Sequence, residues 1–285
     1  ELKIVSLFID PFLNNGFMLN ALAAGTLVAI ACGIVGTFMV LKGLAFLGDA
    51  LSHGVLPGVA VAILWGIPGI VGAAVGSLLM IAGIGVVTKK TKLSADTAIG
   101  LLFVGMLALG VVIVSRSQSF SGDLVKVLFG QFLGISTIDL VIQGAATILL
   151  ALMAFVFQRP FLLLCFSEEQ TQVSGYSAKF YHFLLLLMIA VSVIVAFQTV
   201  GTLLVFGMLV APAASSSFIS RRLGSMMVLA SGFGFIAVYA GLLLSYHFNL
   251  SAGASVVLVA VGIFFSIFLF SQKLKPRRIH ATRCN

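Results

Sequence analysis

The stretch FMLNALAAGTLVAIACGIVGTFMVL, residues 17–41, contains no charged side chain. A helix rises about 1.5 Å per residue, so this segment is long enough to cross the roughly 30 Å hydrocarbon core of a bilayer. A signal peptide has a shorter apolar region followed by a cleavage site of small residues, and this stretch has neither feature. The sequence therefore predicts a membrane-spanning helix here.

Similar apolar segments recur as far as residue 270. Apolar residues make up 61% of the chain and charged residues only 8%, whereas soluble domains carry roughly 25% charge. The alternating ten-residue segments of a β-barrel are absent. We therefore expect an all-α, polytopic helical membrane protein with apolar segments at about 17–41, 44–65, 67–87, 97–115, 137–157, 180–199, 202–220, 225–245 and 251–270.

The number of spans depends on two weak divisions. Gly66-Ile67-Pro68 separates the second and third segments, and only Gly201 separates the sixth and seventh. Each division is either a turn between two helices or a kink within one, because Gly and Pro are found at both. The sequence thus predicts eight or nine transmembrane helices.

The positions of Lys and Arg predict the orientation. If the cluster at 273–278 is cytoplasmic and nine spans alternate, thirteen of the 16 basic residues fall inside and only Lys3, Arg116 and Lys126 fall outside, as the positive-inside rule expects. Because the bases stand at span ends, the net charge of +8 indicates contact with membrane lipid and not with nucleic acid. We expect an external or interfacial segment at 1–16, a transmembrane domain at 17–272 and a basic cytoplasmic tail at 273–285.

Asp49 is the only carboxylate that must lie inside the membrane, and it stands in the run Gly43-Leu-Ala-Phe-Leu-Gly-Asp49-Ala-Leu-Ser-His53-Gly-Val-Leu-Pro57-Gly58. Asp49 and His53 are four residues apart and share one helical face. A charge in hydrocarbon costs about 2.5–3.5 kcal/mol on insertion scales, so residues of this kind are usually functional. The pair is either a structural contact or a cation or proton site, and its oxygen and nitrogen atoms suit Zn²⁺, Mn²⁺ or Fe²⁺.

Two ligands are too few for a tight metal site. Two copies of the chain on a two-fold axis would bring together two Asp and two His side chains, which makes a homodimer attractive. Pro57, a candidate kink just beyond the pair, and Pro212, inside another span, are candidate gate or hinge residues. We expect the hydroxyls of Ser215–Ser217 to satisfy the carbonyl group that Pro212 frees.

Two other features have both a structural and a functional interpretation. His247, near the outer end of a span, is an interfacial histidine or a contact on the metal's way in. Ser167, Glu168 and Glu169 form a helix-start signal and Gly175 a stop signal, which predict a short helix at about 168–174 outside the bilayer. This helix is either a solvated loop element or a docking site for a cytoplasmic partner.

Motifs typical of nucleotide-binding proteins, hydrolytic enzymes and proton-driven carriers are missing from the sequence. It contains no phosphate-binding loop, no metalloprotease or hydrolase motif and no chain of intramembrane acids that could relay protons. We therefore expect a protein that is not an enzyme and holds no tightly bound cofactor. Energy for active transport would come from another subunit, or the protein is a passive channel.

The run Lys42–Gly58 closely resembles the second-helix signature of the metal-type permeases of ATP-binding-cassette (ABC) importers, the zinc, manganese and iron class. Phe166–Gly175 resembles the cytoplasmic coupling helix of that family, and Val200–Ala214 its late-helix signature. Ser245–Gly253 resembles its outer-loop motif but departs from it at Asn249 and Ser251, where acidic and proline residues are expected.

This resemblance implies a homodimeric or paired permease in a bacterial plasma (inner) membrane, with two cytoplasmic ATPase subunits and an external metal-binding protein. Asp49 and His53 become the pore metal ligands, and Glu168, Glu169 and Gly175 belong to the coupling helix. The predicted function is import of Mn²⁺, Zn²⁺ or Fe²⁺. An ATP-independent channel or secondary carrier is the main alternative, and a permease for a bulkier metal chelate is a third.

Overall fold

The computed structural model describes residues 11–12, 16–91, 94–115, 130, 132–202 and 204–274. Within these residues all regular structure is helical and no strand occurs, which confirms the all-α prediction. Eight helices are long and apolar enough to cross a membrane. They are α2 (Gly16–Lys42), α3 (Ala45–Leu64), α4 (Gly69–Lys90), α5 (Ala95–Ser115), α7 (Thr137–Val156), α10 (Ala178–Val200), α12 (Leu223–Phe248) and α13 (Ala252–Leu274).

Both weak divisions of the sequence are turns between separate helices. Gly66, with φ of +68°, lies between α3 and α4, and Gly201, with φ of +86°, follows α10; only glycine adopts such angles without steric cost. The helix after Gly201 is α11 (Val205–Ile219). Its 15 residues span only about 22 Å, so the described part of the chain contains eight helices of spanning length and one shorter apolar helix. Most of the predicted end segments, 1–16 and 273–285, lie outside the described residues.

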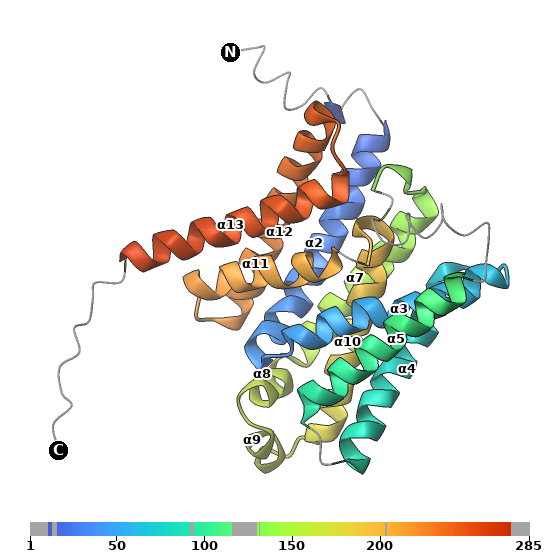
Figure 1. Cartoon of the computed structure of the whole chain (residues 1–285). Coiled ribbons are helices and arrows are strands. Elements are labelled where there is room, and N and C mark those ends of the chain that lie inside the picture. Colours follow the sequence, from blue (N-terminus) through green and yellow to red (C-terminus); the bar gives the residue numbers. More distant parts are fainter. Residues whose placement is uncertain are drawn as a thin grey trace.

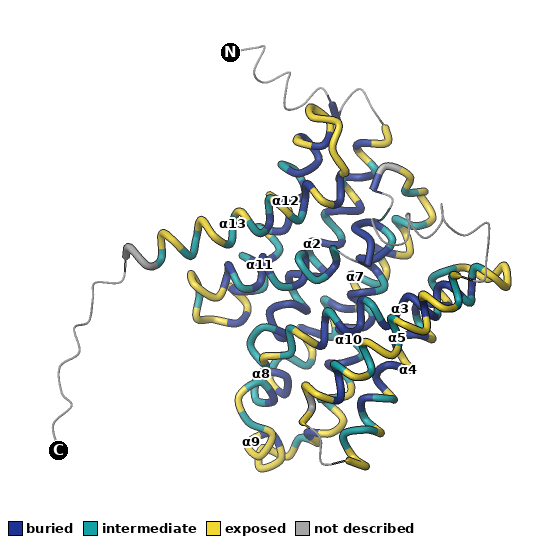
Figure 2. The backbone as a smooth tube through the Cα atoms, viewed as in Figure 1, coloured by how far each residue is buried: buried dark blue, intermediate teal, exposed yellow. Residues whose placement is uncertain are grey.

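The helices form two groups joined by α10 (Figure 1). Helix α2 packs against α7, α10, α11 and α12, while α3 packs against α4 and α5, and α10 contacts both groups. In the most apolar 18 residues of each helix, two thirds of the residues are buried in α2, α3 and α10, but only about a fifth are buried in α5, α7 and α13 (Figure 2). The helix that carries Asp49 and His53 is therefore an interior helix.

Small residues set the contact between α3 and α4. A side chain at Gly58 would overlap the carbonyl oxygen of Gly72, and one at Gly76 would lie 2.8 Å from the carbonyl oxygen of Gly54. Each helix thus presents a small-xxx-small pair to the other, which is how membrane helices approach closely. This contact fixes the rotation of α3 and hence the direction in which its polar face points.

The segment between α7 and α10 folds into an elbow of two short helices, α8 (Gln158–Phe166) and α9 (Glu168–Val173). The predicted short helix at 168–174 is confirmed: the backbone N–H of Gln170 donates to Ser167 Oγ at 3.3 Å, and Gly175 ends the segment with φ of +84°. Helix α8 was not predicted. Its Phe161 is fully buried and packs edge-on against Phe38 of α2, with ring centroids 5.3 Å apart.

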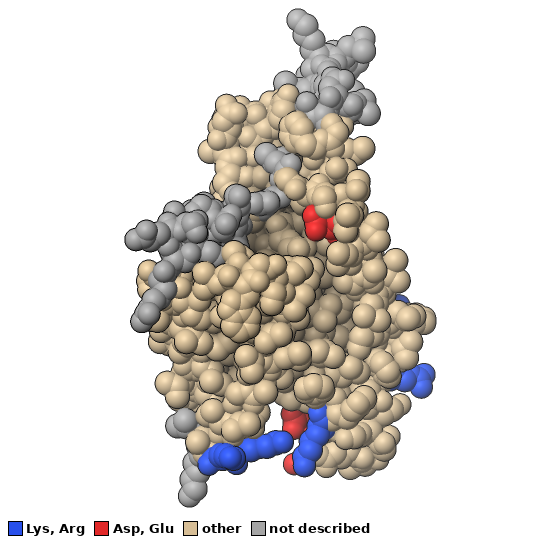
Figure 3. Space-filling model, turned by 90° about the vertical axis from the view of Figure 1, so that its right-hand side faces the viewer, with Lys and Arg blue, Asp and Glu red and all other residues tan. Residues whose placement is uncertain are grey.

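The visible Lys and Arg side chains lie in the lower half of the molecule in Figure 3. Lys42 ends α2, and Lys89 and Lys90 end α4. Basic residues mark the cytoplasmic ends of membrane helices, so the clustering of these side chains agrees with the positive-inside pattern of the sequence.

Candidate metal-binding site

Asp49 and His53 lie one turn apart near the start of α3. Asp49 Oδ1 is 3.8 Å from His53 Nε2, too long for a direct hydrogen bond. A metal ion about 2.1 Å from each atom holds them about 3.0–4.2 Å apart, depending on the angle at the metal. The observed separation therefore suits a shared cation better than a direct contact.

The two side chains differ in exposure. The His53 side chain is 13% exposed and that of Asp49 31% exposed. The His53 ring packs edge-on against Phe103 of α5, with centroids 5.1 Å apart, and its Nδ1 is buried with no hydrogen-bond partner among the described residues. Buried polar atoms are nearly always paired, so this nitrogen is available to a group that the structure does not contain. Packing against Phe103 thus fixes the His53 ring, while the Asp49 carboxylate is partly exposed to solvent.

Neighbouring residues shape the backbone around the pair. Pro57 lies inside α3 without ending it. Because proline has no N–H, the carbonyl oxygen four residues earlier, that of His53, loses its helical hydrogen bond. This oxygen points along the helix toward Pro57 and away from Asp49. The sequence indicated Pro57 as a kink and a gate or hinge candidate, and the structure does not test that role.

The pair is incomplete as a metal site within one chain. The described residues bring together no group of three or more His, Cys, Asp or Glu side chains. Water or a second chain would have to complete the coordination sphere, since metal sites hold four or more ligands.

Two other predicted residues lie elsewhere. His247 is in the last turn of α12, whose main neighbours are α2, α11 and α13, and its ring contacts Tyr246 with centroids 5.5 Å apart. Asn249 adopts the left-handed conformation that caps α12, a position that asparagine tolerates. The structure does not group His247 with the pair on α3.

Pro212 lies inside α11, which continues through it. The expectation that nearby hydroxyls satisfy the freed carbonyl was wrong. Pro212 frees the carbonyl of Met208, whereas the hydroxyls of Ser215, Ser216 and Ser217 donate to Ala211, Ala213 and Ala214. A serine in a helix reaches the carbonyl three or four residues before it, so these hydroxyls stand too far along the chain.

The elbow is connected to α2 by an ion pair. Lys42 Nζ lies 3.3 Å from Glu168 Oε1 and donates to the carbonyl oxygen of Leu164 at 3.0 Å. Glu169 and Gly175 are exposed on the same elbow. Burial raises the pKa of the nearby Cys165 thiol to about 11, against a smaller lowering by Lys42, so the thiol packs as a neutral group. The link between Lys42 and Glu168 was not predicted, because the residues are far apart in sequence.

Eight long apolar helices in the described residues define a multi-pass membrane protein, and one interior helix carries a carboxylate–imidazole pair. The chain belongs to the ABC 3 transport family, whose profile matches residues 14–271. It is 38% identical over 267 residues to the manganese transport system membrane protein MntC of Listeria innocua, covering 94% of this chain and 95% of the relative.

A second relative is a probable iron transport system membrane protein of Haemophilus influenzae. It is 36% identical over 262 residues, covering 92% of this chain and 96% of the relative. Among solved structures, PsaBC from Streptococcus pneumoniae in complex with Fab matches with a TM-score of 0.85 and 36% identity, covering 93% of this chain and 95% of that one. The family and the polytopic fold predicted from the sequence are therefore confirmed.

Proposed function

We propose that this chain is the transmembrane subunit of an ABC importer for a divalent transition metal ion and that Asp49 and His53 bind the ion on its way through the membrane. The 3.8 Å separation of Asp49 Oδ1 and His53 Nε2 on an interior helix carries this proposal. The relatives named for manganese and iron transport support it.

Coordination chemistry supports a range of metals. One carboxylate and one imidazole suit Mn²⁺, Fe²⁺ and Zn²⁺, and the affinity order alone would favour Zn²⁺. The names of the relatives support manganese or iron as cargo, while zinc rests on ligand chemistry alone. A site with few ligands also suits transport, because the ion must leave it again.

We propose that two copies of the chain pair across the site. The incomplete ligand set of one chain supports this, and the 31% exposure of the Asp49 side chain leaves its carboxylate accessible to a second copy. A two-fold axis would then supply two carboxylates and two imidazoles, and closed two-fold dimers are the commonest homo-oligomers.

We infer the remaining partners from the lack of a phosphate-binding loop in this sequence, because the energy for active transport must then come from another subunit. Two cytoplasmic ATPase subunits would bind the elbow, where Phe166 and Val173 expose 74% and 90% of their surface. An external binding protein would deliver the metal at the opposite face. We propose accordingly that residues 17–272 form one permease domain of a bacterial inner-membrane protein, that the C-terminus is cytoplasmic, and that Pro57 and Pro212 are gate or hinge candidates.

Metal uptake into proteoliposomes tests the function. With both partner proteins and ATP present, wild-type complex should accumulate Mn²⁺, and Asp49→Asn should abolish uptake while complex assembly is retained. Asp96→Asn, at an exposed acid in the first turn of α5, is the matched control and should transport normally. Uptake unchanged in Asp49→Asn would refute the assigned role. Metal flux through this chain alone, without ATP, would favour the channel or carrier.

A further inference from the structure

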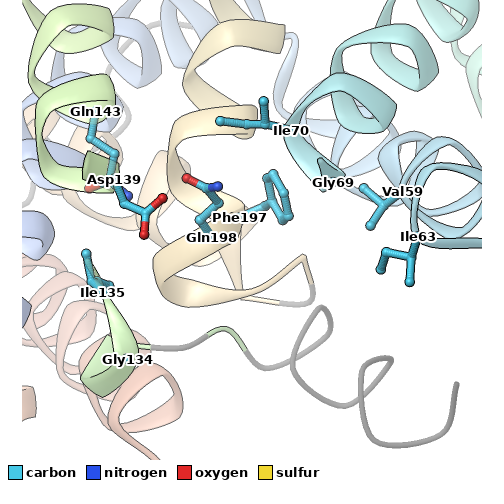
Figure 4. Close-up of a pocket in the computed structure, with 10 residues that line it drawn as sticks. All are labelled: Val59, Ile63, Gly69, Ile70, Gly134, Ile135, Asp139, Gln143, Phe197 and Gln198. Carbon is cyan, nitrogen blue, oxygen red and sulfur yellow. The ribbon is translucent and has the colours of Figure 1, made fainter. Parts of the chain in front are cut away.

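A second polar site lies beyond the Asp49–His53 pair, in a cavity of about 230 Å³ between α3, α4, α7 and α10 (Figure 4). Val59 and Ile63 form part of its wall. They stand six and ten residues after His53, which corresponds to about 9 and 15 Å along the helix. The cavity is thus at the end of α3 away from Lys42 and the elbow.

Three oxygen-bearing side chains line this cavity, Asp139 and Gln143 from α7 and Gln198 from α10. Asp139 and Gln143 are four residues apart and so share one face of α7. Figure 4 shows the Asp139 carboxylate and the Gln198 amide turned toward each other. Asp139 is the one charged residue among the ten described residues that line the cavity, and it contributes a negative charge there.

Gln143 is the most informative of the three. Its side chain is 1% exposed, although most of α7 around it is exposed. Neither its amide oxygen nor its amide nitrogen has a hydrogen-bond partner among the described residues, and the amide oxygen of Gln198 has none either. Native proteins rarely leave buried amides unpaired, and a structural glutamine would be paired to its neighbours.

Asp139 is partly held in place. Its Oδ2 accepts from the backbone N–H of Ser136 at 3.1 Å and from the Ser136 hydroxyl at 2.7 Å, as the capping box of α7. Both bonds involve Oδ2, which leaves Oδ1 able to accept another group. The cap therefore fixes the position of the carboxylate without using both of its oxygens.

We propose that this cavity is a second cation-binding site, in which the oxygens of Asp139, Gln143 and Gln198 bind a partly hydrated divalent ion. Carboxylate and amide oxygens suit Mn²⁺ and other hard cations, whereas Zn²⁺ is better bound by imidazole or thiolate. The cavity has room for several waters, so the ion need not lose its whole hydration shell. The site would hold the ion before the Asp49–His53 pair binds it.

This inference rests on the proposed function only for the identity of the cation. Its test uses protein in which the Asp49–His53 site has been removed by substitution. Complexes with Asp49→Asn and His53→Gln are placed in lipid nanodiscs without nucleotide, and bound Mn²⁺ is measured from the loss of the free-ion signal in electron paramagnetic resonance. This background variant should still bind Mn²⁺. Adding Asp139→Asn and Gln143→Leu should weaken that binding by about tenfold or more, because both charge and ligand count fall.

Matched changes serve as controls in the same background. Asp96→Asn removes an acid from another first helical turn, and Thr147→Val removes a buried polar group one turn further along α7; neither should alter Mn²⁺ binding. Gln143→Glu, which adds a carboxylate, should tighten binding. The proposal is overturned if the background variant binds no Mn²⁺, or if binding is the same with and without the Asp139 and Gln143 changes. Loss of uptake in Asp49→Asn tests the first site alone, so the two failures are distinguishable.

Discussion

Lys42 Nζ lies 3.3 Å from Glu168 Oε1 and joins the last residue of α2 to the first residue of α9. Asp49 stands seven residues after Lys42, just past the turn that starts α3. The ion pair therefore connects the proposed ATPase-binding elbow to the beginning of the helix that carries the ligands. Because Lys42 also donates to the carbonyl of Leu164, one side chain connects α2 to both short helices.

Replacing Lys42 by Met should uncouple ATP hydrolysis from transport. The loss of the ion pair itself should cost about 1 kcal/mol or less, because Glu168 is largely exposed to solvent. The lost hydrogen bond to the Leu164 carbonyl should add about 0.5–1.5 kcal/mol. In proteoliposomes the variant should hydrolyse more ATP per Mn²⁺ transported than wild type, while metal binding is unchanged. Lys89→Met, at the end of α4, is the matched control. If the ratio is the same in both variants, the ion pair does not transmit motion.

Replacing His53 by Asp should change metal preference. The site would keep two hard oxygen ligands and lose its imidazole, which favours Mn²⁺ over Zn²⁺. We expect the ratio of Zn²⁺ to Mn²⁺ affinity to fall by about tenfold or more, equivalent to about 1.4 kcal/mol. Competition between the two ions for uptake measures this ratio. An unaltered ratio would mean that His53 does not contact the cargo.

Replacing Pro57 by Ala should slow metal uptake while equilibrium metal binding stays unchanged, if Pro57 is a hinge of α3. Alanine restores the N–H that bonds the carbonyl oxygen of His53, and this oxygen points along the helix away from Asp49, so the ligand atoms stay in place. Uptake and equilibrium binding of Mn²⁺ measure the two effects, and Pro68→Ala, at the start of α4 outside the helix interior, is the control. Unchanged uptake in Pro57→Ala would rule out a hinge at this residue.

The contact between α3 and α4 predicts opposite effects of one substitution at two glycines. Gly58→Ala would place a methyl group against the backbone of Gly72 and should cost about 1–3 kcal/mol. No atom outside its own helical neighbourhood lies within 4 Å of a side chain added at Gly85, so Gly85→Ala should stabilise α4 by about 0.5–1 kcal/mol. Thermal unfolding in detergent measures both. Equal shifts would contradict the packing described.

Much of the helical pattern was predictable, since apolar length and the charges at helix ends are properties of sequence alone. Predicted segments such as 44–65 and 137–157 differ from α3 and α7 by about a residue at each end. Helix α8 was missed because its buried face, with Pro160, Phe161 and Leu164, exists only where it packs against α2. Propensity carries little information about so short a segment.

The two polar sites differ in how visible they were in the sequence. Asp49 and His53 stand out because ionisable residues are rare inside spans. Asp139 and Gln143 share the same spacing, but a glutamine carries no charge, and only its burial reveals it. The interactions of Lys42 with Glu168 and of His53 with Phe103 join separate helices and required the folded structure.

The assignment of Asp49 and His53 as the metal ligands is tested most directly by an anomalous-scattering map of the complete importer crystallised with Mn²⁺. We predict a metal peak within bonding distance of the Asp49 carboxylate and the His53 imidazole, with a second copy of the chain or water completing its ligands. Strong Mn²⁺ peaks elsewhere in the complex, with none at these two side chains, would contradict the account.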